Sequence, residues 1–303
     1  MIRTLMMLAL ALLAGAAQAA DPVARAGKLE MLAMAPSKYV DPRPVYVWLP
    51  DDYAAKSKAG TRYKVLYVHD GQNQFDVSTT WNKKSWNLEL TLARLIREGK
   101  IADTIAVAIP NNGKLRYAEY FPQKFLPLMS AGYREGLVAQ GMGGKPLADN
   151  YLRFIVDEIK PAVDQQYATQ TDAAGTFLIG SSMGGLISVY GMSEYPQVFG
   201  GAAGLSTHWV GSHQPNSTVP LAAFNYLIAR LPDPATHRVW QDHGTVELDA
   251  IYAPYQPFID QIFRERGYTD ANYISKVYPG TGHNEPAWAE RLAEPLVFLL
   301  GKP

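Results

Sequence analysis

The chain has no cysteine among its 303 residues. Disulfides, cysteine nucleophiles, cysteine-ligated metals and cysteine-linked lipid anchors are therefore excluded. The fold has to be stabilised by its apolar core, and a hydrophobic share of 48% is enough for a large one. Because no linker-like stretch interrupts the sequence, we expect one domain rather than two.

An excess of charge of either sign is also missing. Lys and Arg together number 28, and so do Asp and Glu. A balanced chain offers no basic field for nucleic acid and carries no acidic tail. We therefore expect no nucleic-acid partner, and a small or uncharged substrate fits this balance best. The oligomeric state is left open.

Long hydrophobic runs are confined to the beginning of the chain. Arg3 precedes an apolar run over residues 5–13, and small residues continue to Ala20. This order is typical of a secretory signal, and the run is too short to span a bilayer comfortably. An uncleaved anchor is the alternative, but the polar residues 21–27 that follow disfavour it.

The predicted cleavage site follows Ala19. Ala17 and Ala19 supply the small residues of an A-x-A site. We expect residues 1–19 to be a signal peptide and residues 20–303 to form the mature domain in the periplasm or outside the cell. No stable membrane insertion is expected.

Short apolar runs alternate with stretches of helical period along the rest of the chain. This alternation predicts an α/β fold with a mostly parallel central sheet covered by helices on both faces. The expected strands are residues 44–49, 63–68, 104–109, 176–179, 202–205, 237–241 and 273–278. The expected helices are residues 86–98, 150–166, 186–195, 220–230 and 255–266, with a further helical run from Pro286.

The segment 111–145 breaks this alternation. It holds Gly, Pro, Met and aromatic residues without a clear period, and it is long for a simple connection. Long segments of this kind inside compact domains are often functional. We interpret it as a lid-like insertion over a site, with an irregular surface loop as the alternative.

A serine between two glycines follows the strand expected at 176–179. Residues 180–184 read Gly-Ser-Ser-Met-Gly, which fits Gly-x-Ser-x-Gly with Ser182 at its centre. A strand that turns sharply into a helix exposes one side chain, and the glycines let the backbone pass close by. The pattern predicts a nucleophile elbow.

A serine nucleophile needs a base and an acid that orients the base. His283 lies in a glycine-rich loop directly after the strand expected at 273–278, where α/β-hydrolases carry their histidine. The acid should follow the strand expected at 237–241. Asp242 is the weakest candidate there, and spacing does not separate Glu247 from Asp249.

The remaining histidines do not have the spacing of a metal motif, so we expect no metal and no cofactor. They are His69, His208, His213, His237 and His243.

An oxyanion hole is expected on the other side of the serine. The backbone N–H of Met183 follows the nucleophile, and the second donor comes from the loop after an early strand. In residues 69–75 a glycine allows a tight turn, and the N–H of Gln72 is the expected donor.

Aromatic residues of the segment 111–145, together with Trp209, suggest an aromatic or acyl pocket. Tyr120 and Trp209 are the expected substrate contacts, and core packing is the alternative. The other aromatic residues considered are Tyr117, Phe121 and Phe125.

Taken together, these residues resemble the esterase D and enterochelin-esterase-like branch of the α/β-hydrolases. The matching pieces occur in the expected order over most of the mature chain. They are residues 66–73, 111–122, 151–161, 180–185, 244–250 and 282–288.

The resemblance implies an α/β-hydrolase fold with Ser182 as nucleophile and His283 as base. It favours Asp249 over Glu247, because similar members carry Gly-Thr-x-x-Leu-Asp in the acid loop, although related branches place the acid nearer to Glu247. It also implies that Arg116 and Glu119 form a supporting ion pair. Family members act on feruloyl or acetyl esters of carbohydrates, siderophore lactones and small thioesters, and the export signal disfavours the thioesters.

Three functions compete at this point. The first is an exported serine carboxylesterase that uses a Ser-His-Asp triad and acts on a small-molecule or carbohydrate ester. The second is an acyltransferase on the same scaffold, and the third is a non-catalytic binding protein of this fold. A complete set of candidate catalytic residues disfavours the third.

Overall fold

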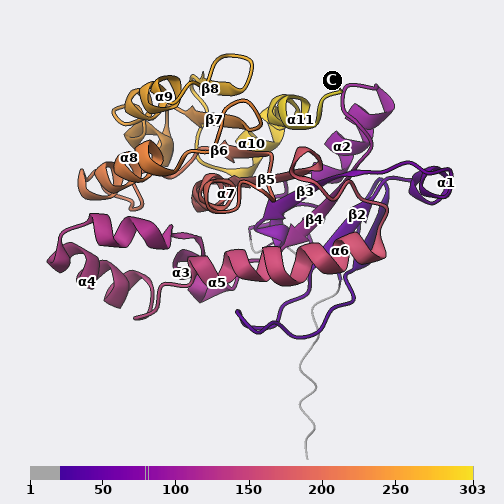
Figure 1. Ribbon diagram of the computed structural model, residues 1–303, viewed down its shortest axis with the longest axis horizontal. Helices are drawn as coiled ribbons and strands as arrows, with labels where there is room; N and C mark the ends of the chain where they lie inside the picture. Colours follow the sequence, from indigo (N-terminus) through magenta and orange to yellow (C-terminus); the bar gives the residue numbers. More distant parts are fainter. Residues whose placement is uncertain (1–20, 79, 81, 303) are drawn as a thin grey trace, which may run out of the picture.

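The computed structural model describes residues 21–78, 80 and 82–302 (Figure 1). The predicted signal peptide, residues 1–19, lies outside the described residues. The strands of the described part form an eight-stranded sheet in the order β1-β2-β4-β3-β5-β6-β7-β8. The pairs β1–β2 and β2–β4 are antiparallel, and the other neighbours are parallel. The mostly parallel sheet is therefore confirmed.

The strands agree closely with the predicted runs. They are β1 (Lys28–Met31), β2 (Tyr46–Leu49), β3 (Lys64–His69), β4 (Thr104–Ile109), β5 (Thr176–Ser181), β6 (Gly201–Leu205), β7 (Arg238–Gly244) and β8 (Tyr273–Tyr278). β4 and β8 have the expected bounds. β1 was not predicted, because this short edge strand carries two charged residues and buries little.

The helices that cover the sheet also lie where the hydrophobic period predicts them. They are α2 (Leu88–Arg97), α5 (Ala148–Arg153), α6 (Lys160–Gln166), α7 (Met183–Glu194), α8 (Thr218–Arg230), α9 (Gln256–Glu265), α10 (Glu285–Arg291) and α11 (Ala293–Leu300). A further short helix, α1 (Tyr53–Lys58), was not predicted and buries none of its residues. A π-helical segment, Phe154–Ile159, joins α5 to α6, so the predicted helix 150–166 continues through both.

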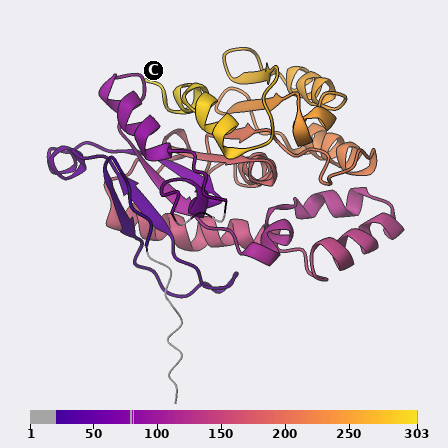
Figure 2. The same cartoon turned by 180° about the vertical axis from the view of Figure 1, so that it is seen from behind.

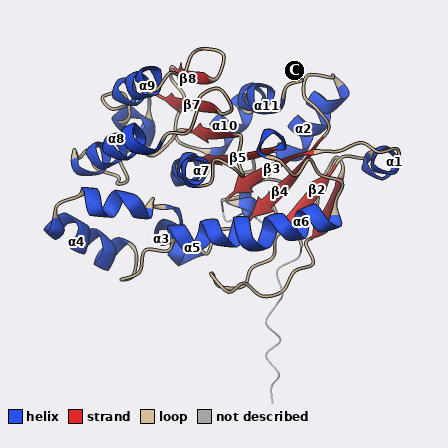
Figure 3. Cartoon of the chain, in the orientation of Figure 1, coloured by secondary structure: helices blue, strands red, loops and turns tan. Residues whose placement is uncertain are grey.

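Two apolar cores lie on opposite faces of the sheet, with helices outside each (Figure 3). Successive strand residues point to opposite faces, so Val65 and Tyr67 of β3 belong to one core while Leu66 and Val68 belong to the other. Helices α5 to α9 cover the first core, and α2, α10 and α11 cover the second. Strands buried on both faces explain the continuous apolar runs.

The segment 111–145 is more ordered than a loop. It contains α3 (Arg116–Tyr120), α4 (Ala131–Gly141) and two 3-10 turns, Gly113–Leu115 and Gln123–Leu128. Figures 1 and 2 show α4 at the end of the molecule opposite to α1. Most of the segment's aromatic side chains are buried in the first core, so much of this insertion is part of the fold.

Candidate active site

The turn between β5 and α7 has the geometry of a nucleophile elbow. Ser182 has φ 57° and ψ −123°, a strained conformation for a residue with a side chain. A Cβ atom on Gly180 would lie 2.5 Å from the carbonyl carbon of Gly184, so the close approach requires glycine. Ser181 still belongs to β5, and the strained position falls on Ser182 as the motif predicts.

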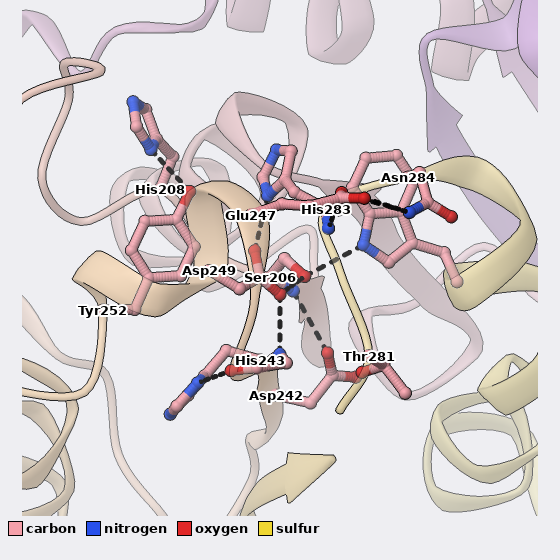
Figure 4. A network of polar contacts seen from close by, with 12 residues as sticks. Ser206, His208, Asp242, His243, Glu247, Asp249, Tyr252, Thr281, His283 and Asn284 are labelled. Carbon is pink, nitrogen blue, oxygen red and sulfur yellow. Dashed lines mark hydrogen bonds and ion pairs between the residues drawn. The ribbon is translucent and has the colours of Figure 1, made fainter. Parts of the chain in front are cut away.

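His283 and Asp249 meet at the carboxyl ends of β8 and β7. His283 Nδ1 lies 2.6 Å from Asp249 Oδ1 (Figure 4). The other oxygen of Asp249 accepts hydrogen bonds from Ser206 Oγ and the backbone N–H of Gly244, both at 2.6 Å. Burial of this carboxyl raises its pKa, but the hydrogen bonds and His283 outweigh burial, so the pKa of Asp249 is lowered.

Glu247 holds the backbone of the same histidine. Its Oε2 accepts the N–H of His283 at 2.8 Å and the Nδ2 of Asn284 at 3.1 Å. A Cβ atom on Gly282 would lie 2.5 Å from this carboxyl group, which explains the glycine before the histidine. The structure therefore brings Asp249 to the imidazole ring and Glu247 to the loop that carries it.

A buried polar layer lies beneath Asp249 and was not predicted from the sequence. Ser206 Oγ accepts hydrogen bonds from Trp288 Nε1 and Arg291 Nη2, both at 2.9 Å. Asp242, the weakest acid candidate, instead pairs with Arg291 at 2.8 Å and accepts the N–H of Ser206 at 3.1 Å. This polar layer fixes the position of the Ser206 hydroxyl, which donates a hydrogen bond to Asp249.

The loop after β3 lies on the other side of the elbow. Its 3-10 turn, Gly71–Asn73, carries Gln72, and a Cβ atom on Gly71 would lie 2.6 Å from the backbone of β4. Met183 is the first residue of α7, where backbone N–H groups have no intrahelical acceptor. Gln72, Met183 and Ser182 line the same cavity, as the predicted oxyanion hole requires.

The cavity has a volume of about 1010 Å³. His283 and Ser182 both line it. Most of the other lining side chains are polar, and they include Asn73, Asn82, Lys84, Asn111, Arg116, Ser212, His213, Asn284 and Glu285.

A family model described as "Putative esterase" matches residues 38–299. The chain belongs to this esterase family. It is therefore a hydrolase of the carboxylesterase type.

Relatives of this esterase span several organisms. Uncharacterized protein YbbA of Bacillus subtilis (strain 168) is 24% identical over 264 residues, which are 84% of this chain and 92% of that protein. An endo-1,4-beta-xylanase/feruloyl esterase of Xylanibacter ruminicola is 27% identical over 188 residues, covering 62% of this chain and 22% of that protein.

Solved structures show the same fold. A ferulic acid esterase matches with a TM-score of 0.63 and 19% identity over 90% of this chain and 98% of that one. The enterobactin esterase FES from Shigella flexneri matches with a TM-score of 0.66 and 17% identity over 92% of this chain and 60% of that one. The fold of this esterase is that of an α/β-hydrolase.

Two residues that were expected to contact the substrate, Tyr120 and Trp209, lie outside the cavity. Tyr120 is fully buried, and its Oη accepts the N–H of Asp70 at 3.1 Å. Trp209 is 2% exposed and belongs to the first core. Neither residue lines the cavity, whereas Tyr117 and Trp288 do. The expectation that Tyr120 and Trp209 contact substrate is corrected, because both side chains are buried in the first core.

The predicted ion pair between Arg116 and Glu119 is wrong. The guanidinium group of Arg116 binds both oxygens of Asp70, each at 2.7 Å, while Glu119 accepts from Arg43 at 2.7 Å. Asn111 Nδ2 adds a bond of 2.6 Å to Asp70. The segment after β4 is thereby tied to the oxyanion loop.

Of the other histidines of the esterase, His237 and His243 are buried and do not line the cavity. His69 is buried, and its Nδ1 lies 2.8 Å from Tyr151 Oη, while His208 and His213 line the cavity. No group of three or more metal-ligating residues occurs within residues 21–78, 80 and 82–302. In the same ranges no helix is long and apolar enough to cross a bilayer.

Proposed function

We propose that the chain hydrolyses carboxylic esters with Ser182 as nucleophile, His283 as general base and Asp249 as the orienting acid. The contact between Asp249 and His283 at 2.6 Å carries this proposal, because His283 lines the same cavity as the strained Ser182. A hydrogen bond from Nδ1 to Asp249 leaves Nε2 free to accept a proton.

Acylation begins when His283 Nε2 takes the proton of Ser182 Oγ and the oxygen attacks the ester carbonyl carbon. The carbonyl oxygen becomes negative, and the N–H groups of Met183 and Gln72 stabilise it. The intermediate then collapses, the bond to the alcohol breaks, and the alcohol oxygen receives the proton from the imidazolium. The acyl group remains on Ser182.

Deacylation repeats these steps with water. His283 takes a proton from water, the hydroxide attacks the acyl carbon, and Ser182 Oγ recovers the proton as it leaves. The lowered pKa of Asp249 keeps its carboxylate charged at neutral pH. That charge stabilises the imidazolium in both steps.

For the substrate, we propose a bulky ester with several hydrogen-bonding groups. The ferulic acid and enterobactin esterases among the structural neighbours carry such compounds in their names. The cavity of about 1010 Å³ is large for a simple acetyl ester, and its lining combines the amide and cationic groups of Asn111, Asn284 and Arg116 with apolar surface from Tyr117 and Trp288. Tyr117 and Trp288 support a place for an aromatic or acyl group in this lining, as the sequence suggested.

We also propose that the enzyme is exported and that its mature chain begins at Ala20. The charged start, short apolar run and A-x-A site support this. N-terminal sequencing of protein recovered from the envelope or medium tests it, and a start at Met1 would contradict it.

Ser182→Ala tests the proposed chemistry. It should reduce ester hydrolysis by about 10³-fold or more and abolish labelling by a serine-reactive phosphonate, because only the attacking oxygen is lost. Ser193→Ala is the matched control, since Ser193 lies later in α7 and its Oγ donates to the backbone carbonyl of Val189, one turn earlier in the same helix, at 2.9 Å. An unlabelled wild-type enzyme, or an active Ser182→Ala variant, would refute the assignment.

A further inference from the structure

Tyr252 and His208 form a hydrogen-bonded pair next to the nucleophile. Tyr252 Oη lies 2.7 Å from His208 Nδ1 (Figure 4). The Tyr252 hydroxyl also interacts with the side chain of Ser182. Both residues are almost completely buried, at 2% and 4% exposure. The pair is separate from the contact between Asp249 and His283.

Further contacts fix the pair to the proposed triad. The backbone N–H of His208 donates to the carbonyl oxygen of Ser182 at 3.2 Å, and the N–H of Tyr252 donates to that of Asp249 at 3.0 Å. The rings of Tyr252 and His283 meet edge to face, with centroids 6.0 Å apart. Tyr252 is thus held by backbone to the acid and by side chain to the nucleophile.

The strand order places this pair opposite to the oxyanion hole. Gln72 follows β3, on one side of β5, whereas His208 follows β6 and Tyr252 lies in the segment after β7, on the other side. Tyr252 therefore approaches Ser182 away from the oxyanion donors. It does not line the cavity, although His208 does, so its hydroxyl contacts the nucleophile rather than substrate.

The protonation states fix the direction of the hydrogen bonds. Burial raises the pKa of Tyr252 well above its usual value and lowers the pKa of His208 to about 3, so both are neutral near pH 7. For catalysis, Ser182 must donate its proton toward His283. Its oxygen can then only accept from Tyr252, which in turn accepts from Nδ1–H of His208.

We propose that Tyr252, held by His208, is a positioning residue that donates a hydrogen bond to Ser182 Oγ and keeps this oxygen oriented toward His283. The proposal rests on the proposed role of Ser182 as nucleophile. A fixed oxygen spends more time in the attacking geometry, so the pair acts on the rate of acylation. It leaves the binding of a small substrate unchanged.

Tyr252→Phe removes the hydroxyl and keeps the ring. The variant should lower kcat for a small activated acetyl ester, and the rate of phosphonate labelling at Ser182, by about tenfold at unchanged KM. A merely structural role would not produce this split between kcat and KM at an unchanged melting temperature. Tyr255→Phe is the matched control, because Tyr255 Oη donates to the backbone of Asn216 at 2.9 Å, outside the cavity.

A double-mutant cycle tests whether the two residues act together. His208→Ala should cause a similar loss, and combining it with Tyr252→Phe should add little, since both remove one hydrogen-bonded unit. His208→Asn places a donor near the position of Nδ1 and should restore most of the rate. This arm also tests the proposal if Tyr252→Phe does not fold.

Two results would contradict the proposed positioning role of Tyr252 and His208, and neither would affect the proposed ester hydrolysis. One is a Tyr252→Phe enzyme with wild-type kcat, and the other is a double variant whose losses multiply. Failure of the proposed function looks different, because the wild-type enzyme itself would then not be labelled at Ser182.

Discussion

Asp249 and Glu247 are two residues apart, yet they bind different parts of His283. Glu247 has φ 57°, which turns the chain at the start of a 3-10 turn, Glu247–Ile251. The turn directs one carboxylate to the imidazole and the other to the backbone of the histidine loop. Only the first can stabilise a proton that moves onto the ring.

We therefore predict unequal effects of removing the two charges. Asp249→Asn should lower kcat by about 10³-fold or more, because an amide does not stabilise the imidazolium. Glu247→Gln should stay within about threefold of wild type, since the amide oxygen still accepts the N–H of His283. Steady-state kinetics on a small activated ester measures both. A dead Glu247→Gln enzyme with an active Asp249→Asn enzyme would exchange the two roles.

Local sequence was sufficient for some residues of the site and not for others. The placement of Ser182 and His283 at one cavity could be predicted, because each belongs to a glycine-rich turn with a fixed place relative to a strand. Tyr120 and Trp209 were misplaced, since an aromatic residue near a site looks the same whether it faces substrate or core. Ser206 and Tyr252 were missed because long-range packing alone brings them to the site.

At the scale of elements, the loop after β3 and the segment after β4 are joined by an ion pair whose carboxylate is buried and whose guanidinium group is partly exposed. Asp70 has φ 53° and is 6% exposed, and it binds Arg116 and Asn111. Burial raises the pKa of Asp70, but Arg116 and the hydrogen bonds lower it further than burial raises it. The pair keeps the turn with Gln72 in place beside Ser182.

Asp70→Asn should reduce the free energy of unfolding at pH 7 by about 2 kcal/mol, because a charge-assisted pair is lost. Since the pKa of Asp70 is lowered in the folded state, its contribution to stability is complete above the ordinary pKa of an aspartate and is lost progressively as the pH falls from there through the lowered pKa. The difference in the free energy of unfolding between Asp70→Asn and wild type should therefore shrink toward pH 3. Urea unfolding at both pH values measures it, and a difference that grows in acid would contradict the lowered pKa.

Elements whose sequence has a clear hydrophobic period could be predicted. Elements whose structure depends on contacts with neighbouring elements could not. β4 and β8 match their apolar runs, and the helix of 150–166 was seen despite its π segment. In α4, by contrast, no residue is buried, so its sequence has no apolar stripe to detect. β1 gains its strand form from pairing with β2.

At the scale of the whole molecule, the segment 111–145 connects the site to the core. Phe125 packs against Tyr226 of α8 at a centroid distance of 5.2 Å, and also against Phe121 and Tyr190. The start of the segment, with Asn111 and Arg116, lines the cavity. The segment 111–145 is therefore anchored on α7 and α8, unlike a lid that opens and closes over the site.

Phe125→Ala should accordingly destabilise the protein by about 3 kcal/mol, because it leaves a cavity among buried rings. The exposed Leu128 belongs to the same 3-10 turn, Gln123–Leu128, and Leu128→Ala should change stability by less than about 0.5 kcal/mol. Both folded enzymes should keep the wild-type KM for bulky esters, since neither residue lines the cavity. Denaturant unfolding and steady-state kinetics check the two expectations. A Phe125→Ala enzyme of unchanged stability whose KM rises only for bulky esters would mean that the segment acts as a lid on the substrate.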